Sequence, residues 1–319
     1  MIVFCALAFA SVAAVLLALR AGSLGASWAD VLAALGGDAS TTATAVIREL
    51  RLPRAVAAFA SGALLALSGA LMQVLLRNPL ADPYVLGVSG GAAVGALGAL
   101  SIGLSTVAAD ASAFAGALAA MLLVFGLARG DGSWTQTRLL LTGVIVAAGC
   151  GAVVTLMLSM AHDARVHSML FWLMGDASAA GRPWPALGLL AFAVLACLPL
   201  ARDLNVLARG DLGARALGVA VDRLRVAIYV LASLLTATAV TMIGTVGFVG
   251  LIVPHLVRLA IGNDQRVLLP ASALAGGALL VLADTAARLV LSPLQLPVGV
   301  LTALIGVPVF LFLLARHYR

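Results

Sequence analysis

Apolar residues in this chain gather into blocks that are each about as long as a helix, and short polar segments separate the blocks. Nine of them cover residues 2–19, 54–76, 84–104, 107–128, 139–160, 185–201, 226–243, 268–287 and 297–315. A tenth, shorter stretch follows Gly244 and Gly247 and ends at Ala260. No block shows the two-residue alternation of a membrane β-barrel strand. The pattern predicts an all-α integral membrane protein, one domain over residues 1–319 with about ten transmembrane helices.

One polar segment between two apolar blocks, residues 203–225, has the pattern of a structured surface helix. Asp211 is a good N-cap residue, because its carboxylate can accept a free backbone N–H of the first turn. Gly218 can end the helix in a left-handed conformation. The apolar side chains that share one face at helical spacing are Leu212, Ala216 and Leu217. Two interpretations stay open: an ordinary surface helix, or a docking helix for a soluble partner.

Composition supports the membrane assignment and excludes one activity. Hydrophobic residues make up 63% of the chain and charged residues 10%, with a mean hydropathy of +1.15, whereas soluble domains carry about 25% charged residues. All 19 basic residues are arginine. A Walker A motif needs a lysine for the phosphates, so this chain is not expected to hydrolyse ATP by that route.

The arginines also predict the orientation in the membrane. Ten spans put both termini on one side. Twelve arginines fall on that side: Arg77, Arg129, Arg138, Arg202, Arg209, Arg215, Arg223, Arg225, Arg258, Arg266, Arg316 and Arg319. Seven fall on the other: Arg20, Arg48, Arg51, Arg54, Arg165, Arg182 and Arg288. The richer side is expected to be cytoplasmic, together with both termini and the 203–225 segment. The cluster at 48–54 opposes this bias, which suggests a function there.

Several polar or reactive residues have an ordinary structural explanation. The three cysteines, Cys5, Cys150 and Cys197, lie within apolar blocks and fit neither a disulfide framework nor a metal site. His255 has no second ligand at suitable spacing in its block, which favours a packed histidine over a metal or haem ligand. Asp82 could take part in a proton relay, but capping of the loop after Pro79 is the favoured interpretation. We therefore expect no metal site.

Long stretches of the chain resemble one known family. The stretches are LRLPR (50–54), GALMQVLLRNPLADPYVLGVSGGAAVGA (69–96), FWLMGD (171–176), LARGDLGARALGV (207–219), GTVGFVGLIVPHLVRLAIGNDQRVLLPASAL (244–274), ADTAARL (283–289) and LPVGVLTALIGVPVF (296–310). Together they resemble the FecCD family, membrane permeases of type II ABC importers that carry ferric siderophores, haem or vitamin B12. Two residues depart from the family pattern: Gln295 stands where glutamate is often found, and Asp176 where serine is common.

The resemblance implies a homodimer in the bacterial inner membrane, with two cytoplasmic ATPase subunits that bind ATP and Mg and with a periplasmic binding protein. It implies no cofactor on this chain and no nucleic-acid partner. The residues that match the family's ATPase-coupling segment are Gly210, Asp211, Ala214, Arg215, Leu217 and Gly218. Those that match docking arginines for the binding protein are Arg51, Arg54 and Arg288. Candidate lining of the translocation pathway comprises Thr142, Gly143, Gly149 and Gly299.

The docking arginines have competing explanations. Arg51 and Arg54 could meet carboxylates of a binding protein bidentately, or could reach lipid phosphates at the membrane surface. Arg288 lies four residues after Asp284 on the same helix face and could pair with it.

The expected function is inward transport of a metal chelate, a ferric siderophore or haem, with vitamin B12 import as the alternative. A rival from another class is an ion-coupled secondary transporter, which usually carries paired ionisable groups at mid-membrane. Here Asp284 and Arg288 form the only nearby pair in the apolar blocks. A passive channel would leave the charged surface helix unexplained.

Overall fold

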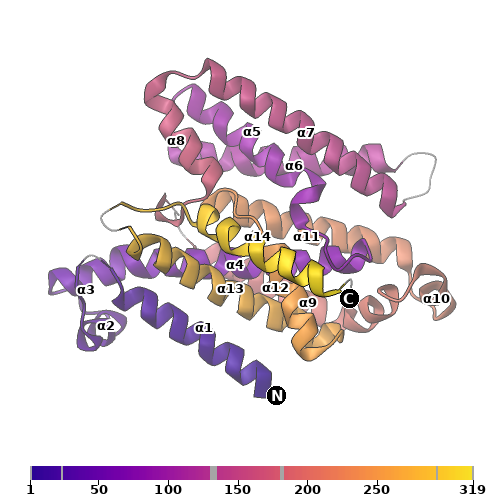
Figure 1. Cartoon of the computed structure of the whole chain (residues 1–319), viewed down its shortest axis with the longest axis horizontal. Coiled ribbons are helices and arrows are strands. Elements are labelled where there is room, and N and C mark those ends of the chain that lie inside the picture. Colours follow the sequence, from indigo (N-terminus) through magenta and orange to yellow (C-terminus); the bar gives the residue numbers. More distant parts are fainter. Residues whose placement is uncertain (1, 23, 130–134, 180–182, 292–293, 318–319) are drawn as a thin grey trace.

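Within the described residues, ten apolar helices lie at the positions of the ten apolar blocks, and Figure 1 shows their arrangement. The computed structural model describes residues 2–22, 24–129, 135–179, 183–291 and 294–317. The ten helices are α1 (Ile2–Arg20), α4 (Leu52–Leu75), α5 (Val88–Ser101), α6 (Thr106–Ala128), α7 (Gln136–Met160), α9 (Trp184–Leu207), α11 (Val221–Ile243), α12 (Val249–Ile261), α13 (Gln265–Leu289) and α14 (Val298–His317). Within the described residues seven are long and apolar enough to cross a membrane, while α5, α12 and α14 are shorter.

Short helical segments connect these helices. They are α2 (Trp28–Leu35), α3 (Thr42–Val46), the π-helical turn η1 (Ile47–Arg51), the 3-10 turn η2 (Pro83–Leu86), α8 (Asp163–Met174), the 3-10 turn η3 (Ala177–Ala179) and α10 (Asp211–Ala216). α3, η1 and α4 run on as one helical rod over residues 42–75. The second span therefore begins well before the predicted start at residue 54.

Helix α4 forms the centre of the body and is buried along most of its length. Glycines bring its neighbours close. A Cβ atom on Gly62 would lie 2.3 Å from the carbonyl oxygen of Gly276 in α13, and one on Gly69 would lie 1.8 Å from that of Gly250 in α12. Small residues at such positions let helix backbones pack closely in a membrane.

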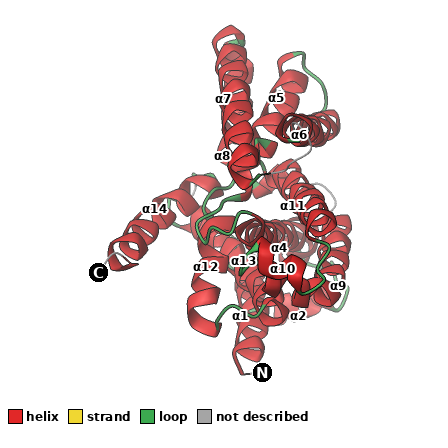
Figure 2. Cartoon of the chain, turned by 90° about the vertical axis from the view of Figure 1, so that its right-hand side faces the viewer, coloured by secondary structure: helices red, strands yellow, loops and turns green. Residues whose placement is uncertain are grey.

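Helices α5 to α8 form a second group beside this body (Figure 1). α5 packs on α6 through small residues, and a Cβ atom on Gly91 would lie 2.3 Å from the carbonyl oxygen of Gly116. These small residues therefore let α5 and α6 approach closely. α7 and α14 keep large apolar side chains exposed, such as Ile145 and Leu304. Figure 2 shows α14 splayed away from the rest of the body.

The two ends of the bundle differ in what they carry. Both chain termini lie toward the end that holds α10, and α2 and α3 lie at the opposite end (Figure 1). We call these the α10 end and the α3 end. The predicted surface segment 203–225 is only partly a separate element, because α9 extends into it and α11 starts within it. The surface helix proper is α10.

Candidate functional site

Two groups of predicted site residues lie at opposite ends of the bundle, and α10 forms the first. It follows Gly210, whose φ of 133° puts it in a region that favours glycine. The helix ends in a Schellman arrangement: the N–H of Gly218 (φ 81°) donates to Arg215 O at 3.0 Å and that of Val219 to Ala214 O at 3.0 Å. The left-handed end predicted at Gly218 is confirmed.

The predicted N-cap role of Asp211 is wrong. Gly210 occupies the cap position, and Asp211 is the first residue of α10, with no capping hydrogen bond to the helix. Its carboxylate turns instead toward two arginines. Oδ2 accepts a hydrogen bond from Nη2 of the buried Arg225 at 2.5 Å, and Oδ1 lies 3.8 Å from Nη1 of Arg77. Asp211 therefore ties α10 to α11 and to the segment after α4, and its charge still favours the helix N-terminus.

Two apolar side chains on and just after α10 are exposed. Leu212 is 87% exposed and Leu217 is 71% exposed, while Ala214 is buried against the body. Arg215 is exposed and pairs with Asp222 at 2.7 Å between Nη2 and Oδ1. We call α10 together with Leu217 the platform. Its buried alanine packs on the body, an ion pair holds its first residue, and its two exposed leucines make its outer surface partly apolar.

At the α3 end, Arg51 points inward and is only 7% exposed. Its Nη1 donates to the carbonyl oxygens of Leu19 and Arg20 at 2.9 and 3.0 Å, and its Nη2 donates to that of Leu24 at 2.5 Å. A Cβ atom on Gly22 would lie 2.6 Å from Nη2, so glycine leaves room for the guanidinium. Arg51 thus caps the C-terminal end of α1.

Arg54 and Arg288 share one buried carboxylate. Nη2 of Arg54 lies 2.9 Å from Oδ1 of Asp284, and its Nε lies 3.0 Å from Oδ2, a bidentate pair. Nε of Arg288 lies 3.3 Å from Oδ2 of the same aspartate, which confirms the pairing suggested by their spacing. Arg288 also donates to carbonyl oxygens of Ala18 and Ala21 at 3.4 and 3.3 Å. All three predicted docking arginines are therefore engaged within this chain, which requires a revised docking proposal.

Both residues that depart from the family pattern lie beside Arg54. Gln295 Oε1 accepts a hydrogen bond from Arg54 Nη1 at 3.0 Å, and Asp176 Oδ1 lies 3.8 Å from Arg54 Nη2. Where the family often has a glutamate, this chain has the neutral Gln295, and where serine is common it has the charged Asp176. Both side chains lie beside the guanidinium of Arg54. The two departures compensate each other in charge.

The four candidate pathway residues have different surroundings. Gly143 and Gly299 have a packing explanation, because a Cβ atom on Gly143 would lie 2.2 Å from Val85 O and one on Gly299 would lie 2.3 Å from Met174 O. Gly149 has open space where a side chain would be, and Thr142 is half-buried. Only Thr142 and Gly149 lie on the partly open side of α7.

The residues set aside as structural can also be located. Asp82 Oδ1 accepts the backbone N–H of Tyr84 at 2.7 Å and caps η2, as predicted. The Tyr84 hydroxyl in turn donates to Val246 O at 3.0 Å, a link that the sequence did not suggest. His255 is buried. The described part of the chain contains no group of three or more metal-ligating side chains.

Sequence reasoning missed Asp284 as a shared partner of two arginines on different helices. A carboxylate inside an apolar block that also holds an arginine was a usable signal for a buried pair. It missed the inward direction of Arg51 altogether, and the π-helical turn that redirects this side chain has no recognisable sequence signal.

Comparisons with known proteins agree with this architecture. Residues 10–316 match the model of the FecCD transport family. The chain is 45% identical over 278 residues to the cobalamin import system permease protein BtuC of Halobacterium salinarum, covering 86% of this chain and 74% of that protein. It is 41% identical to the hemin transport system permease protein HmuU of Yersinia pestis, covering 84% and 82% of the two chains.

The similarity extends over the full length in two further comparisons. The Fe(3+) dicitrate transport system permease protein FecD of Escherichia coli is 40% identical, covering 99% of this chain and 98% of that protein. A solved structure described as an inward-facing conformation of a metal-chelate type ABC transporter superposes with a TM-score of 0.84 at 30% identity, covering 98% of both chains. The chain therefore belongs to the FecCD transport family, the permease subunits of ATP-binding cassette importers.

Proposed function

We propose that two copies of this chain form the membrane-spanning part of an importer that moves a metal chelate across the bacterial inner membrane into the cytoplasm. ATP and Mg are bound by two separate ATPase subunits, and a periplasmic binding protein delivers the substrate. The α10 end faces the cytoplasm, together with both termini. Three relatives named for cobalamin, hemin and Fe(3+) dicitrate support this substrate class, because each of those cargoes holds a metal in an organic ligand.

The observation that carries the proposal is the platform made by α10. Its exposed Leu212 and Leu217 give an apolar contact surface, and the Asp211–Arg225 ion pair fixes it to the body. Gly210, Ala214, Arg215 and Gly218 set its shape and ends. An ATPase that closes on this platform would move α10 together with α11, which passes the motion into the membrane.

Binding-protein docking takes a revised form in this proposal. Arg51 has its donors engaged with α1, and Arg54 and Arg288 are engaged with Asp284, so none offers a free fork to a partner. Arg48, from the same cluster, is exposed, and its one hydrogen bond within the described residues goes to Gly37 O in the loop between α2 and α3. We propose that Arg48 makes the first contact with a partner carboxylate, and that Arg54 contributes through its partly exposed pair with Asp176.

The translocation pathway is proposed to run between the exposed faces of α7 and α14 and the same faces of a second copy. Exposed Ile145 and Leu304 would otherwise face lipid. Thr142 and Gly149 would then line the pathway, while Gly143 and Gly299 keep its walls in shape.

A ferric siderophore or haem is the first substrate proposed, and a corrinoid is the second. The second is favoured by one specific observation, the 45% identity to a cobalamin import permease. The test is ATP-dependent uptake by vesicles that contain this chain, its ATPase and its binding protein. Uptake of one chelate, abolished by omitting the ATPase, supports the proposal. Uptake that follows an ion gradient without ATP would overturn it.

A further inference from the structure

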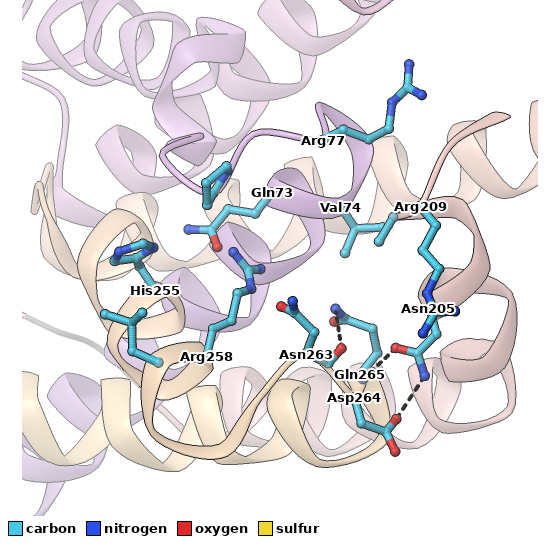
Figure 3. Close-up of a pocket in the computed structure, with 13 residues that line it drawn as sticks. Gln73, Val74, Arg77, Asn205, Arg209, His255, Arg258, Asn263, Asp264 and Gln265 are labelled. Atoms are coloured by element: carbon cyan, nitrogen blue, oxygen red, sulfur yellow. Dashed lines mark hydrogen bonds between the residues drawn. The ribbon is translucent and has the colours of Figure 1, made fainter. Parts of the chain in front are cut away.

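A recessed basic pocket lies at the α10 end, between the ends of α4, α9 and α12 and the start of α13 (Figure 3). Its volume is about 890 Å³. Three arginines line it: Arg77, Arg209 and Arg258. It lies beside α10 and includes none of that helix's residues, so the platform described above does not account for it.

The pocket has more positive charge than its own acid can balance. Arg209 and Arg258 make no hydrogen bond or ion pair with any described residue of the chain, and Arg258 is half-buried. Asp264, the acidic residue that lines the pocket, is engaged within the chain. Its Oδ1 accepts hydrogen bonds from Asn205 Nδ2 at 2.8 Å and from Arg266 N at 3.1 Å. The Asn205 hydrogen bond holds the pKa of the Asp264 carboxyl below its usual value, so it stays a charged cap of α13. The guanidinium groups of Arg209 and Arg258 are therefore available to bind an anion.

Two buried acceptor atoms in the same pocket also lack partners. Gln73 is 3% exposed, and its Nε2 donates to Leu251 O at 3.1 Å, while its Oε1 is buried and has no hydrogen-bond partner among the described residues. Oε1 of Gln265, which is 2% exposed, has none either. Figure 3 shows the side chains of Gln73 and Arg258 pointing toward one another. A buried acceptor without a partner is unfavourable, so the missing ligand should bring hydrogen-bond donors as well as negative charge.

One wall of the pocket is apolar and continues along the outside of α12. Leu259 lines the pocket and is 57% exposed. Leu256, one turn earlier on the same helix, is 41% exposed. A ligand held by Arg258 could therefore extend an apolar part along α12 toward the membrane.

We propose that this pocket binds the headgroup of an anionic glycerophospholipid. The phosphate lies between Arg258 and Arg209, where guanidinium groups bind phosphate oxygens bidentately. A rotation of the Gln73 and Gln265 side chains toward the pocket lets headgroup hydroxyls donate to their Oε1 atoms, and the acyl chains follow Leu259 and Leu256. An acidic side chain of a partner protein fits less well, because a carboxylate brings no donor for the two glutamines. The inference holds whichever chelate the protein carries.

The test is native mass spectrometry of the purified chain with phosphatidylglycerol or phosphatidylcholine, together with thermal unfolding in the same two lipids. Arg258→Gln is the test variant. Arg266→Gln is the matched control, because Arg266 is an exposed arginine at the same end that does not line the pocket. We expect wild type and Arg266→Gln to retain phosphatidylglycerol and to unfold at higher temperature in it. We expect Arg258→Gln to bind it at least tenfold more weakly and to lose the thermal shift.

A replacement variant and three contrary outcomes complete the test. If Arg258→Gln does not fold, Arg209→Gln replaces it, since Arg209 is exposed and carries no packing role. Equal lipid retention by the pocket variant and the Arg266→Gln control would overturn the proposal. So would displacement of the lipid by millimolar inorganic phosphate, which would assign the pocket to a free anion. Loss of the lipid whenever the ATPase is bound, with protection of Arg258 by that subunit, would assign it to a protein carboxylate instead.

Discussion

Two groups of arginines, one at each end of this molecule, are in opposite situations. At the α3 end, Arg51, Arg54 and Arg288 point into the protein and are engaged by carbonyl oxygens and Asp284. At the α10 end, Arg209 and Arg258 have no partner among the described residues. A buried guanidinium must be paired, because leaving it unpaired is very costly. An open one can serve a ligand. The contrast shows that burial and pairing, more than position along the chain, separate structural arginines from those available for binding.

Exposed leucines occur at both ends, for example Leu212 in α10 and Leu50 just before α4, so the difference between the ends lies in their charges. At the α3 end the ion-pair network links α1, α4 and α13 and reaches the segments after α8 and before α14 through Asp176 and Gln295. We infer that buried ion pairs hold the α3 end together, while the α10 end keeps the pocket arginines Arg209 and Arg258 available for a ligand. The predictions below test this difference.

The largest effect is expected when the shared carboxylate is removed. Asp284→Ala removes the carboxylate that pairs with the buried Arg54 and Arg288, which should destabilise the fold by about 3–5 kcal/mol. Thermal or denaturant unfolding in detergent measures this. The control is Asp222→Ala, which breaks the exposed pair with Arg215 and should cost less than about 1 kcal/mol. Equal losses in the two variants would refute the claim that the α3 end depends on its buried charges.

A smaller loss of stability and a large loss of transport are expected from Asp211→Ala. The change frees the buried Arg225 from its ion pair and should cost about 1–3 kcal/mol. α10 would then keep only its exposed Arg215–Asp222 ion pair to α11, so ATP-driven uptake should fall while the ten-helix body survives. Uptake in vesicles and unfolding of the same preparation are the measurements. Normal uptake with normal assembly would mean that α10 does not transmit motion.

The charge exchange beside Arg54 predicts a coupled pair. Asp176→Ser removes one negative charge from Arg54, and Gln295→Glu adds one. Each single change should destabilise the fold by about 1 kcal/mol, the first because Arg54 loses a carboxylate and the second because three carboxylates then surround one guanidinium. The double change should be nearly neutral, which gives a coupling energy of about 2 kcal/mol. A double-mutant cycle by thermal unfolding measures it. Additive single effects would show that the two positions do not compensate.

The smallest effect on the fold is expected from Arg48→Glu. Arg48 is exposed, so its reversal should leave unfolding unchanged within about 0.5 kcal/mol. If it guides a binding protein, the association rate should fall and lose part of its salt dependence. Surface plasmon resonance with the binding protein provides this measurement. Arg51→Glu is the contrasting variant: it should fail by misfolding, since its guanidinium caps α1.

Much of the fold was predictable because lipid imposes one strong rule. Backbone groups in a bilayer must be satisfied within the chain, so each apolar block has to be a helix. All ten blocks are helices for this reason. The Gly218 helix end and the Asp284–Arg288 pair were predictable from local spacing alone, through φ > 0 at glycine and helical periodicity.

The site was less predictable because the partner of a charged group is set by packing. Spacing favoured Asp211 as an N-cap. The carboxylate of Asp211 instead pairs with the buried Arg225 of α11, a charged partner that binds it more strongly than a backbone N–H would. Arg51 was expected to face a partner protein, whereas the π-helical turn and Gly22 direct it into the end of α1. Neither competing contact is visible in the local sequence, since both join segments that meet only in the fold.

The central claim is that α10 is the surface on which the ATPase closes, and cross-linking tests it most directly. In a chain with Cys5, Cys150 and Cys197 replaced by alanine, Leu217→Cys and Leu50→Cys place one thiol at each end. The two leucines are matched in exposure, at 71% and 65%. In the assembled transporter we predict that a thiol-reactive cross-linker joins position 217 to the ATPase and does not join position 50 to it. An intact complex in which position 217 stays unlinked and freely reactive would contradict the account.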